Sequence, residues 1–117
     1  MTHEFNRTPR PTHSPWGAVQ DADQVMPGIW SVGTSSHGGF QVSAERMAAS
    51  GFLREFVPLS FNGQGKAGWF EEDCDWCFIP LAFPDEWKAW RGDRADAEIV
   101  EAQRVFDQWI KPKADAA

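Results

Sequence analysis

Residues 29–42 read IWSVGTSSHGGFQV, and this stretch decides the class of fold that the sequence predicts. Apolar and polar residues alternate in 29–33 and again in 40–42, as they do in strands with one buried face. The residues between these runs, TSSHGG at 34–39, have the composition of a turn. Two alternating runs around a glycine-rich turn predict a β-hairpin.

Helical signals follow the hairpin. Ser43 favours the start of a short helix over 44–50, and Gly51 favours its end. A longer helix is predicted over 94–110, with Asp93 as its cap and with apolar residues at helical spacing: Ala95, Ile99, Ala102, Phe106 and Trp109. The segment 71–83 is open between helix and strand. We expect a strand near 75–82, because Pro80 argues against a helix.

The chain has 117 residues, which is the length of one domain. We expect residues 1–14 to form a flexible N-terminal tail and 15–110 to form the domain, with a possible short strand at 16–20. Residues 111–117 should fray beyond the helix, because Pro112 is a stop signal. The predicted fold is α+β: a small single domain whose short antiparallel sheet packs against a C-terminal helix.

The chain is acidic, with 11 Lys and Arg against 17 Asp and Glu and a formal net charge of -6. That balance disfavours direct binding to nucleic acid phosphates. The sequence contains neither an apolar run of the length that spans a membrane nor a secretory signal core, which predicts a cytoplasmic protein. Within 61–87, Lys66 is the one basic residue among Glu71, Glu72, Asp73, Asp75, Asp85 and Glu86.

Several short blocks occur in an order that resembles a known family: SPWG at 14–17, PGI at 27–29, HGGF at 37–40, SAER at 43–46, GWFEEDCDW at 68–76 and LAFP at 81–84. The family comprises small uncharacterised proteins and domains encoded on plasmids, phages and other mobile elements of proteobacteria. The resemblance implies this genomic setting and no catalytic residues. Small proteins of mobile elements often act against host defence systems.

Charge and resemblance together favour a non-enzymatic accessory protein that binds a host protein or nucleoprotein complex with a basic surface. An anti-defence inhibitor, of the anti-CRISPR or anti-restriction type, would use an acidic surface to compete with nucleic acid. Trp87 and Trp90 are candidate anchors of such an interface. The predicted partner-binding residues are Glu71, Glu72, Asp73, Asp75, Asp85, Glu86, Trp87 and Trp90. No cofactor, metal, direct nucleic acid ligand or membrane is predicted.

The alternative is a small enzyme with an acid/base or metal site. His37 lies in the predicted turn, where a base could approach carboxylates such as Glu71 and Asp73. Glu45 and Arg46 are further polar residues within the family-like blocks. A third possibility is a structural subunit of a larger assembly, with exposed tryptophans.

The two cysteines form one Cys-x-x-Cys motif, Cys74 to Cys77. Structural zinc needs four ligands, and the other soft ligands of the chain are His3, His13 and His37. Acidic neighbours also disfavour the thiolate that redox chemistry needs. The motif therefore favours two core thiols.

Overall fold

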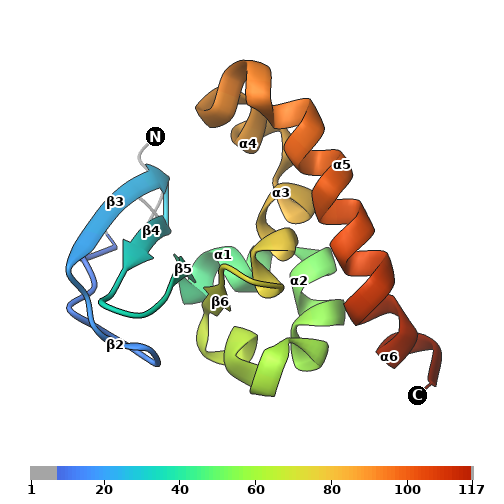
Figure 1. The fold of residues 1–117 in the computed structure, drawn as a ribbon, viewed down its shortest axis with the longest axis horizontal. Helices are drawn as coiled ribbons and strands as arrows, with labels where there is room; N and C mark the ends of the chain where they lie inside the picture. Colours follow the sequence, from blue (N-terminus) through green and yellow to red (C-terminus); the bar gives the residue numbers. More distant parts are fainter. Residues whose placement is uncertain (1–7, 117) are drawn as a thin grey trace.

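The predicted hairpin forms the middle of a four-stranded antiparallel sheet in the computed structural model, which describes residues 8–116. Strands β4 (Ile29–Gly33) and β5 (Gly38–Val42) pair from Ile29 opposite Val42 to Gly33 opposite Gly38. The outer strands are β3 (Asp21–Met26) and β6 (Trp69–Glu71), in the order β3-β4-β5-β6. The hairpin prediction is confirmed (Figure 1).

The strand expected at 16–20 is only partly present. Two-residue strands, β1 (His13–Ser14) and β2 (Gly17–Ala18), form a separate ribbon, and the long outer strand β3 begins at Asp21. Strand β3 was not predicted because it contains two aspartates, and aspartate is depleted in strands. Charged side chains are nevertheless common on edge strands such as this one. Of the predicted N-terminal tail, residues 1–7 lie outside the described residues, and 13–14 belong to β1.

The short helix after the hairpin is confirmed as α1 (Ala44–Ala49), capped by the Ser43 hydroxyl, which accepts the Arg46 N–H at 3.2 Å. Gly51 does not end the helical region, contrary to the prediction. Ser50 ends α1 and caps a second helix, α2 (Gly51–Phe56), in the same way. Two 3-10 segments follow, η2 (Val57–Leu59) and η3 (Phe61–Ala67).

The strand predicted near 75–82 is wrong. This segment forms a 3-10 turn, η4 (Asp75–Cys77), and a helix, α3 (Phe78–Ala82). Pro80 is the third residue of α3, where a missing N–H breaks no helical hydrogen bond. Pro84 likewise opens the next helix, α4 (Pro84–Arg91).

The C-terminal helix is confirmed, but its ends and one face differ from the prediction. Asp93 does not cap it and lies in a 3-10 turn, η5 (Gly92–Arg94), before α5 (Ala95–Val105). A π-helical turn, η6 (Phe106–Ile110), then advances the helix by one residue, so Ile110 is buried and Trp109 is 53% exposed. The helix also continues through Pro112 as α6 (Lys111–Ala116), so this proline does not end the helix as predicted.

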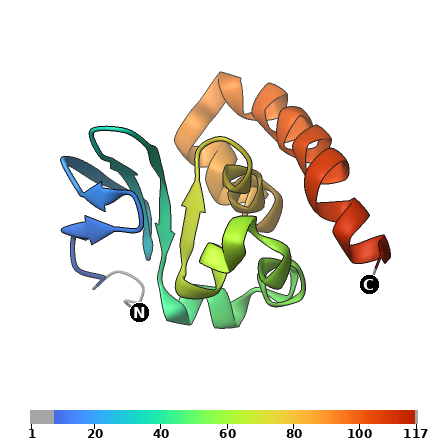
Figure 2. The same ribbon diagram turned by 60° about the horizontal axis from the view of Figure 1, so that its bottom comes forward.

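One core joins the sheet to the helices. Phe40, Val42 and Phe70 of the sheet and Phe78 of α3 belong to a continuous buried cluster that reaches Phe106. Helix α5 contacts α3, α4 and η4, and α3 lies between it and the sheet (Figures 1 and 2). The α+β single-domain prediction is confirmed. Among residues 8–116, no helix combines the length and the apolar character that crossing a membrane requires.

Arg46 joins three parts of this fold and is 5% exposed. Its Nε donates to the Pro27 carbonyl at 2.6 Å, and its guanidinium forms an ion pair with Glu86. The same group lies 4.4 Å from the centre of the Phe83 ring. Arg46 therefore links the β3–β4 turn and α1 to the start of α4.

The closest backbone approach in the sheet predicts a large effect of one methyl group. A Cβ at Gly39 would lie 2.7 Å from Cη2 of Trp16 and closer still to the Phe70 carbonyl oxygen. Gly39→Ala should lower the free energy of unfolding by about 1–3 kcal/mol, because strand backbone cannot yield. Gly51→Ala is the control, since its nearest neighbour is 3.8 Å away. Denaturant unfolding would measure both, and equal stabilities would contradict the prediction.

Candidate functional site

The acidic segment 71–75 divides into inward and outward side chains. Glu71, at the end of β6, is 8% exposed. Its carboxylate accepts the backbone N–H groups of Asp73 at 2.8 Å, Cys74 at 2.6 Å and Asp75 at 3.3 Å. Glu71 therefore closes the turn that follows β6, in the way that a capping side chain satisfies a helix start.

Asp75 is fully buried, and both of its carboxylate oxygens accept the Phe61 N–H, at 3.1 and 2.9 Å. Burial raises the pKa of this carboxyl to about 6, with the nearby Glu71 charge adding to the rise and the Phe61 hydrogen bond opposing it. The predicted partner-binding role is corrected for Glu71 and Asp75, because buried carboxylates that hold the backbone cannot contact a partner.

The predicted partner-binding residues of α4 also differ in exposure. Trp87 is 3% exposed, and its indole N–H donates to Glu98 at 3.1 Å, so burial corrects its predicted role as an interface anchor. Glu86 is paired with Arg46. Asp85 is exposed in the first turn of α4, and Trp90 is 37% exposed with an edge-on contact to Phe40.

Glu72 is exposed at one end of the sheet, where two glycines face each other. Gly33 pairs with Gly38, so both glycines point to the same face. Oε2 of Glu72 lies 2.8 Å from the position that a Cβ would take at Gly38. Oδ2 of Asp21, on the other outer strand, lies 3.7 Å from the same position at Gly33. The two carboxylates thus flank a floor without side chains.

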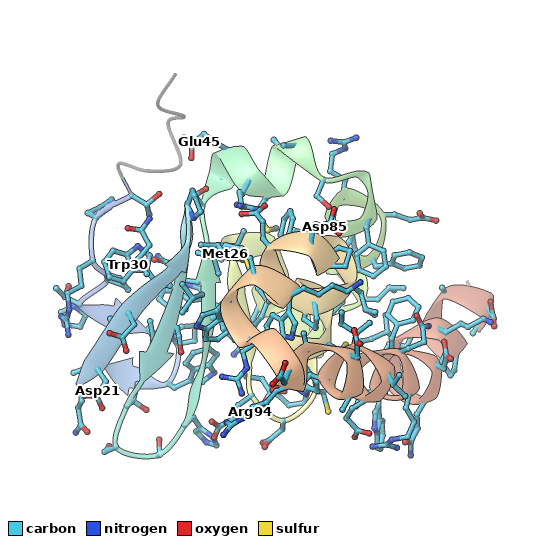
Figure 3. The ribbon with its side chains drawn as sticks, turned by 90° about the horizontal axis from the view of Figure 1, so that it is seen from above. Asp21, Met26, Trp30, Glu45, Asp85 and Arg94 are labelled. Atoms are coloured by element: carbon cyan, nitrogen blue, oxygen red, sulfur yellow. The ribbon has the colours of Figure 1, made fainter. Side chains whose placement is uncertain are left out.

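This sheet end is hollowed into a cleft of about 420 Å³, lined by residues that include Ser31, Gly33, His37, Phe40 and Glu72. Figure 3 labels Asp21 at the same end of the sheet. Within residues 8–116, neither Asp21 nor Glu72 has an ion pair or a side-chain hydrogen bond. We define Asp21, Gly33, Gly38 and Glu72 as the acidic sheet end.

A second cleft, also about 420 Å³, brings His37, Glu71 and Asp73 together with Cys74 and Trp16. In the described part of the chain, no hydrogen bond or ion pair joins the His37 ring to a carboxylate. Glu45 and Arg46 do not line this cleft. The residues of the enzyme hypothesis are therefore assembled in part, without a hydrogen-bonded acid/base pair.

The described residues form no cluster of metal ligands, and burial disfavours the thiolate form of both cysteines. Across residues 8–116, no group of three or more His, Cys, Asp and Glu side chains could hold a metal ion. Burial raises the pKa of the Cys77 thiol to about 12. Burial, followed by the charges of Glu71, Asp75 and Asp73, also raises the pKa of the Cys74 thiol. Both cysteines are free, as expected for core thiols.

Residues 9–114 match the family described as "Domain of unknown function (DUF7007)". The chain belongs to this family. The match spans every element from β1 to α5 and most of α6, including both clefts. No curated protein and no solved structure gives a significant match. The DUF7007 assignment therefore defines the domain, while its chemistry has to be inferred from the residues.

Sequence reasoning missed Asp21 and the glycine floor. Asp21 is 51 positions from Glu72 in the chain, and only the pairing of four strands brings both to one sheet end. The sequence did contain one signal for the glycine floor, the pair Gly38-Gly39. We interpreted this pair as part of a turn, although both residues lie in β5.

The buried carboxyl of Asp75 predicts an unusual pH dependence. Its pKa is about 6 in the folded protein against 3.8 ordinarily, so its contribution to stability is full below about pH 4 and is lost as pH rises through 6. Asp75→Asn keeps an oxygen acceptor for Phe61 and removes the titration. The variant should therefore gain stability relative to the parent protein between pH 4 and 7.

Urea unfolding of both proteins at several pH values measures this difference. Asp107→Asn, at an exposed position on the C-terminal helix, is the matched control and should show no such trend. A stability difference between Asp75→Asn and the parent that does not change with pH would contradict the assignment.

Proposed function

We propose that this DUF7007 protein is a non-enzymatic accessory protein of a mobile element that binds a basic surface of a host protein or nucleoprotein complex in the cytoplasm. In this proposal it inhibits a defence complex, of the restriction or CRISPR type, by occupying a surface that otherwise holds nucleic acid. The acidic sheet end supports the binding chemistry. The resemblance of the blocks in 14–84 supports the genomic setting.

The observation that carries the proposal is the placement of Asp21 and Glu72 over Gly33 and Gly38. Two exposed carboxylates approach one floor from opposite edges of the sheet. The missing glycine side chains let both carboxylates lie close to the sheet, where a lysine or arginine side chain of a partner would approach them from solvent. A guanidinium or ammonium group would there gain charge-assisted hydrogen bonds to both carboxylates.

Neighbouring residues extend this surface. Phe40 lines the cleft and contacts the ring of Trp90, which is 37% exposed. Partly exposed tryptophans are favoured anchors in protein interfaces. Glu72 is followed by the exposed Asp73, so the segment after β6 adds a further negative charge. With a net charge of -6, the protein is repelled by nucleic acid and attracted to the basic surfaces that bind it.

The alternative enzyme function has one favourable observation, the cleft shared by His37, Glu71 and Asp73. Acid/base catalysis requires groups within about 2.6–3.2 Å of the atoms between which the proton moves. The Glu71 oxygens are already occupied by three backbone N–H groups. Binding is therefore better supported than catalysis.

Charge reversal at the acidic sheet end tests the proposal. Asp21→Lys/Glu72→Lys should lower the affinity for a basic partner at least tenfold, because attraction becomes repulsion at two contact points. The partner would be captured from a nuclease-treated bacterial lysate and displaced by a polyanion. Its affinity for the purified parent and variant would then be measured by calorimetry.

The control, Glu55→Lys/Asp115→Lys, changes the net charge equally at exposed positions on α2 and α6. It should retain the partner. Equal capture by the sheet-end variant, or equal loss in the control, would overturn the assignment to the acidic sheet end. A folded protein that captures no basic partner would count against the proposed function.

A further inference from the structure

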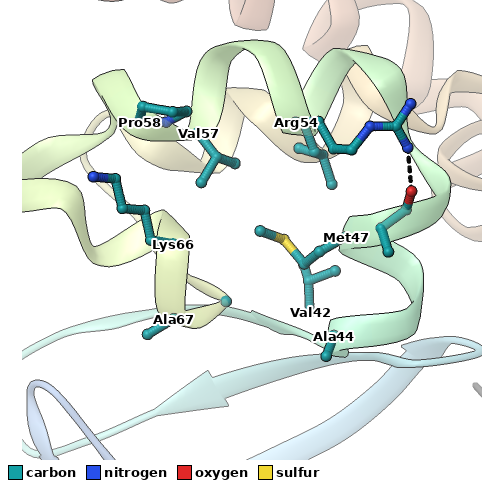
Figure 4. Close-up of a pocket in the computed structure, with 11 residues that line it drawn as sticks. Val42, Ala44, Met47, Arg54, Val57, Pro58, Lys66 and Ala67 are labelled. Atoms are coloured by element: carbon teal, nitrogen blue, oxygen red, sulfur yellow. Dashed lines mark hydrogen bonds between the residues drawn. The ribbon is translucent and has the colours of Figure 1, made fainter.

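A second kind of hollow, with mostly aliphatic walls, lies at the other end of β5. It has a volume of about 520 Å³, within the range of about 300–1,000 Å³ that is typical of small-molecule sites. Figure 4 shows it between α1 on one side and the segment from α2 to η3 on the other. We call it the aliphatic groove, and its lining residues are Val42, Ala44, Met47, Ala48, Leu53, Arg54, Val57, Pro58, Lys66, Ala67 and Gly68.

The floor of the groove is built from branched aliphatic side chains. Val42, Leu53 and Val57 are buried, at 3%, 0% and 4% exposure. Met47 is half-buried beside them, and its flexible thioether can adapt to an unbranched chain. Among the residues that the structure describes, none that lines the groove is aromatic. An aliphatic ligand therefore matches these walls better than a flat aromatic one.

The charged residues of the lining are both cations, in a chain with a net charge of -6. Figure 4 shows Lys66 and Arg54 on opposite sides of the aliphatic floor. Arg54 donates one hydrogen bond to the Ala48 carbonyl, which leaves further guanidinium N–H donors. Within residues 8–116, the Lys66 ammonium has neither a hydrogen bond nor an ion pair.

We propose that the aliphatic groove binds a medium-chain aliphatic carboxylate, with the chain on Val42, Met47 and Val57 and the carboxylate at Lys66. Burying the chain removes apolar surface of both partners from water. The carboxylate receives a charge-assisted hydrogen bond from an ammonium that lacks a partner within the described chain. This site is separate from the acidic sheet end, and its test does not depend on the proposed partner.

Decanoate, kept below its micelle-forming concentration, is the probe. Isothermal titration calorimetry should show saturable binding to the full chain. Decylamine should bind at least tenfold more weakly, because its ammonium is repelled by Lys66. Amide NMR shifts should move for residues of the groove, Met47, Val57 and Lys66, and stay unchanged at Gly38.

Two variants test the contact with the carboxylate and the contact with the aliphatic chain separately. Lys66→Met should lower decanoate affinity about tenfold. Lys88→Met, at an exposed lysine of α4 outside the groove, should not change it. Ala48→Trp places a large side chain in the groove from an exposed helix position and should abolish binding without unfolding the protein.

Absence of decanoate binding by the folded protein would overturn the proposal. Equal binding of decanoate and decylamine, or an unchanged affinity in Lys66→Met, would overturn the role of the cation. Unchanged affinity in folded Ala48→Trp would place the ligand elsewhere and overturn the site.

Discussion

The turn after β6 depends on one buried carboxylate. Glu71 takes three consecutive backbone N–H groups, those of residues 73–75, and thereby reverses the chain at the edge of the sheet. From this turn, η4 and α3 enter the core and bring Phe78 under the sheet. The same turn directs Glu72 and Asp73 outward. Structural and surface carboxylates are therefore neighbours in one short segment.

Strand β5 separates two surfaces of different chemistry. Its first residue, Gly38, forms part of the acidic sheet end, and its last, Val42, forms part of the floor of the aliphatic groove. Four residues of extended chain span roughly 13 Å. Anionic and cationic sites at this spacing interact only weakly, because salt screens exposed charges beyond about 8–10 Å. The proposed partner surface and the proposed ligand pocket would therefore not neutralise each other.

Prediction from sequence succeeded where local signals decide the structure. Alternation and a glycine-rich turn predicted the hairpin, and Ser43 predicted the start of α1. It failed where packing overrides a local signal. Pro80 looked like a helix breaker, yet the first turn of α3 accepts it. The helical spacing of Ala95, Ala102 and Phe106 was correct up to the π turn, after which Ile110 replaces Trp109 in the core.

The sequence by itself determined that this is an acidic α+β domain with a central hairpin and a C-terminal helix. Only the tertiary structure decided which acidic residues face solvent. Glu71 and Asp75 turn inward because backbone N–H groups need acceptors there, whereas Asp21 and Glu72 lie at the same end of the sheet because four strands align their ends. Composition counts charges, but burial and strand register decide which of them a partner can reach.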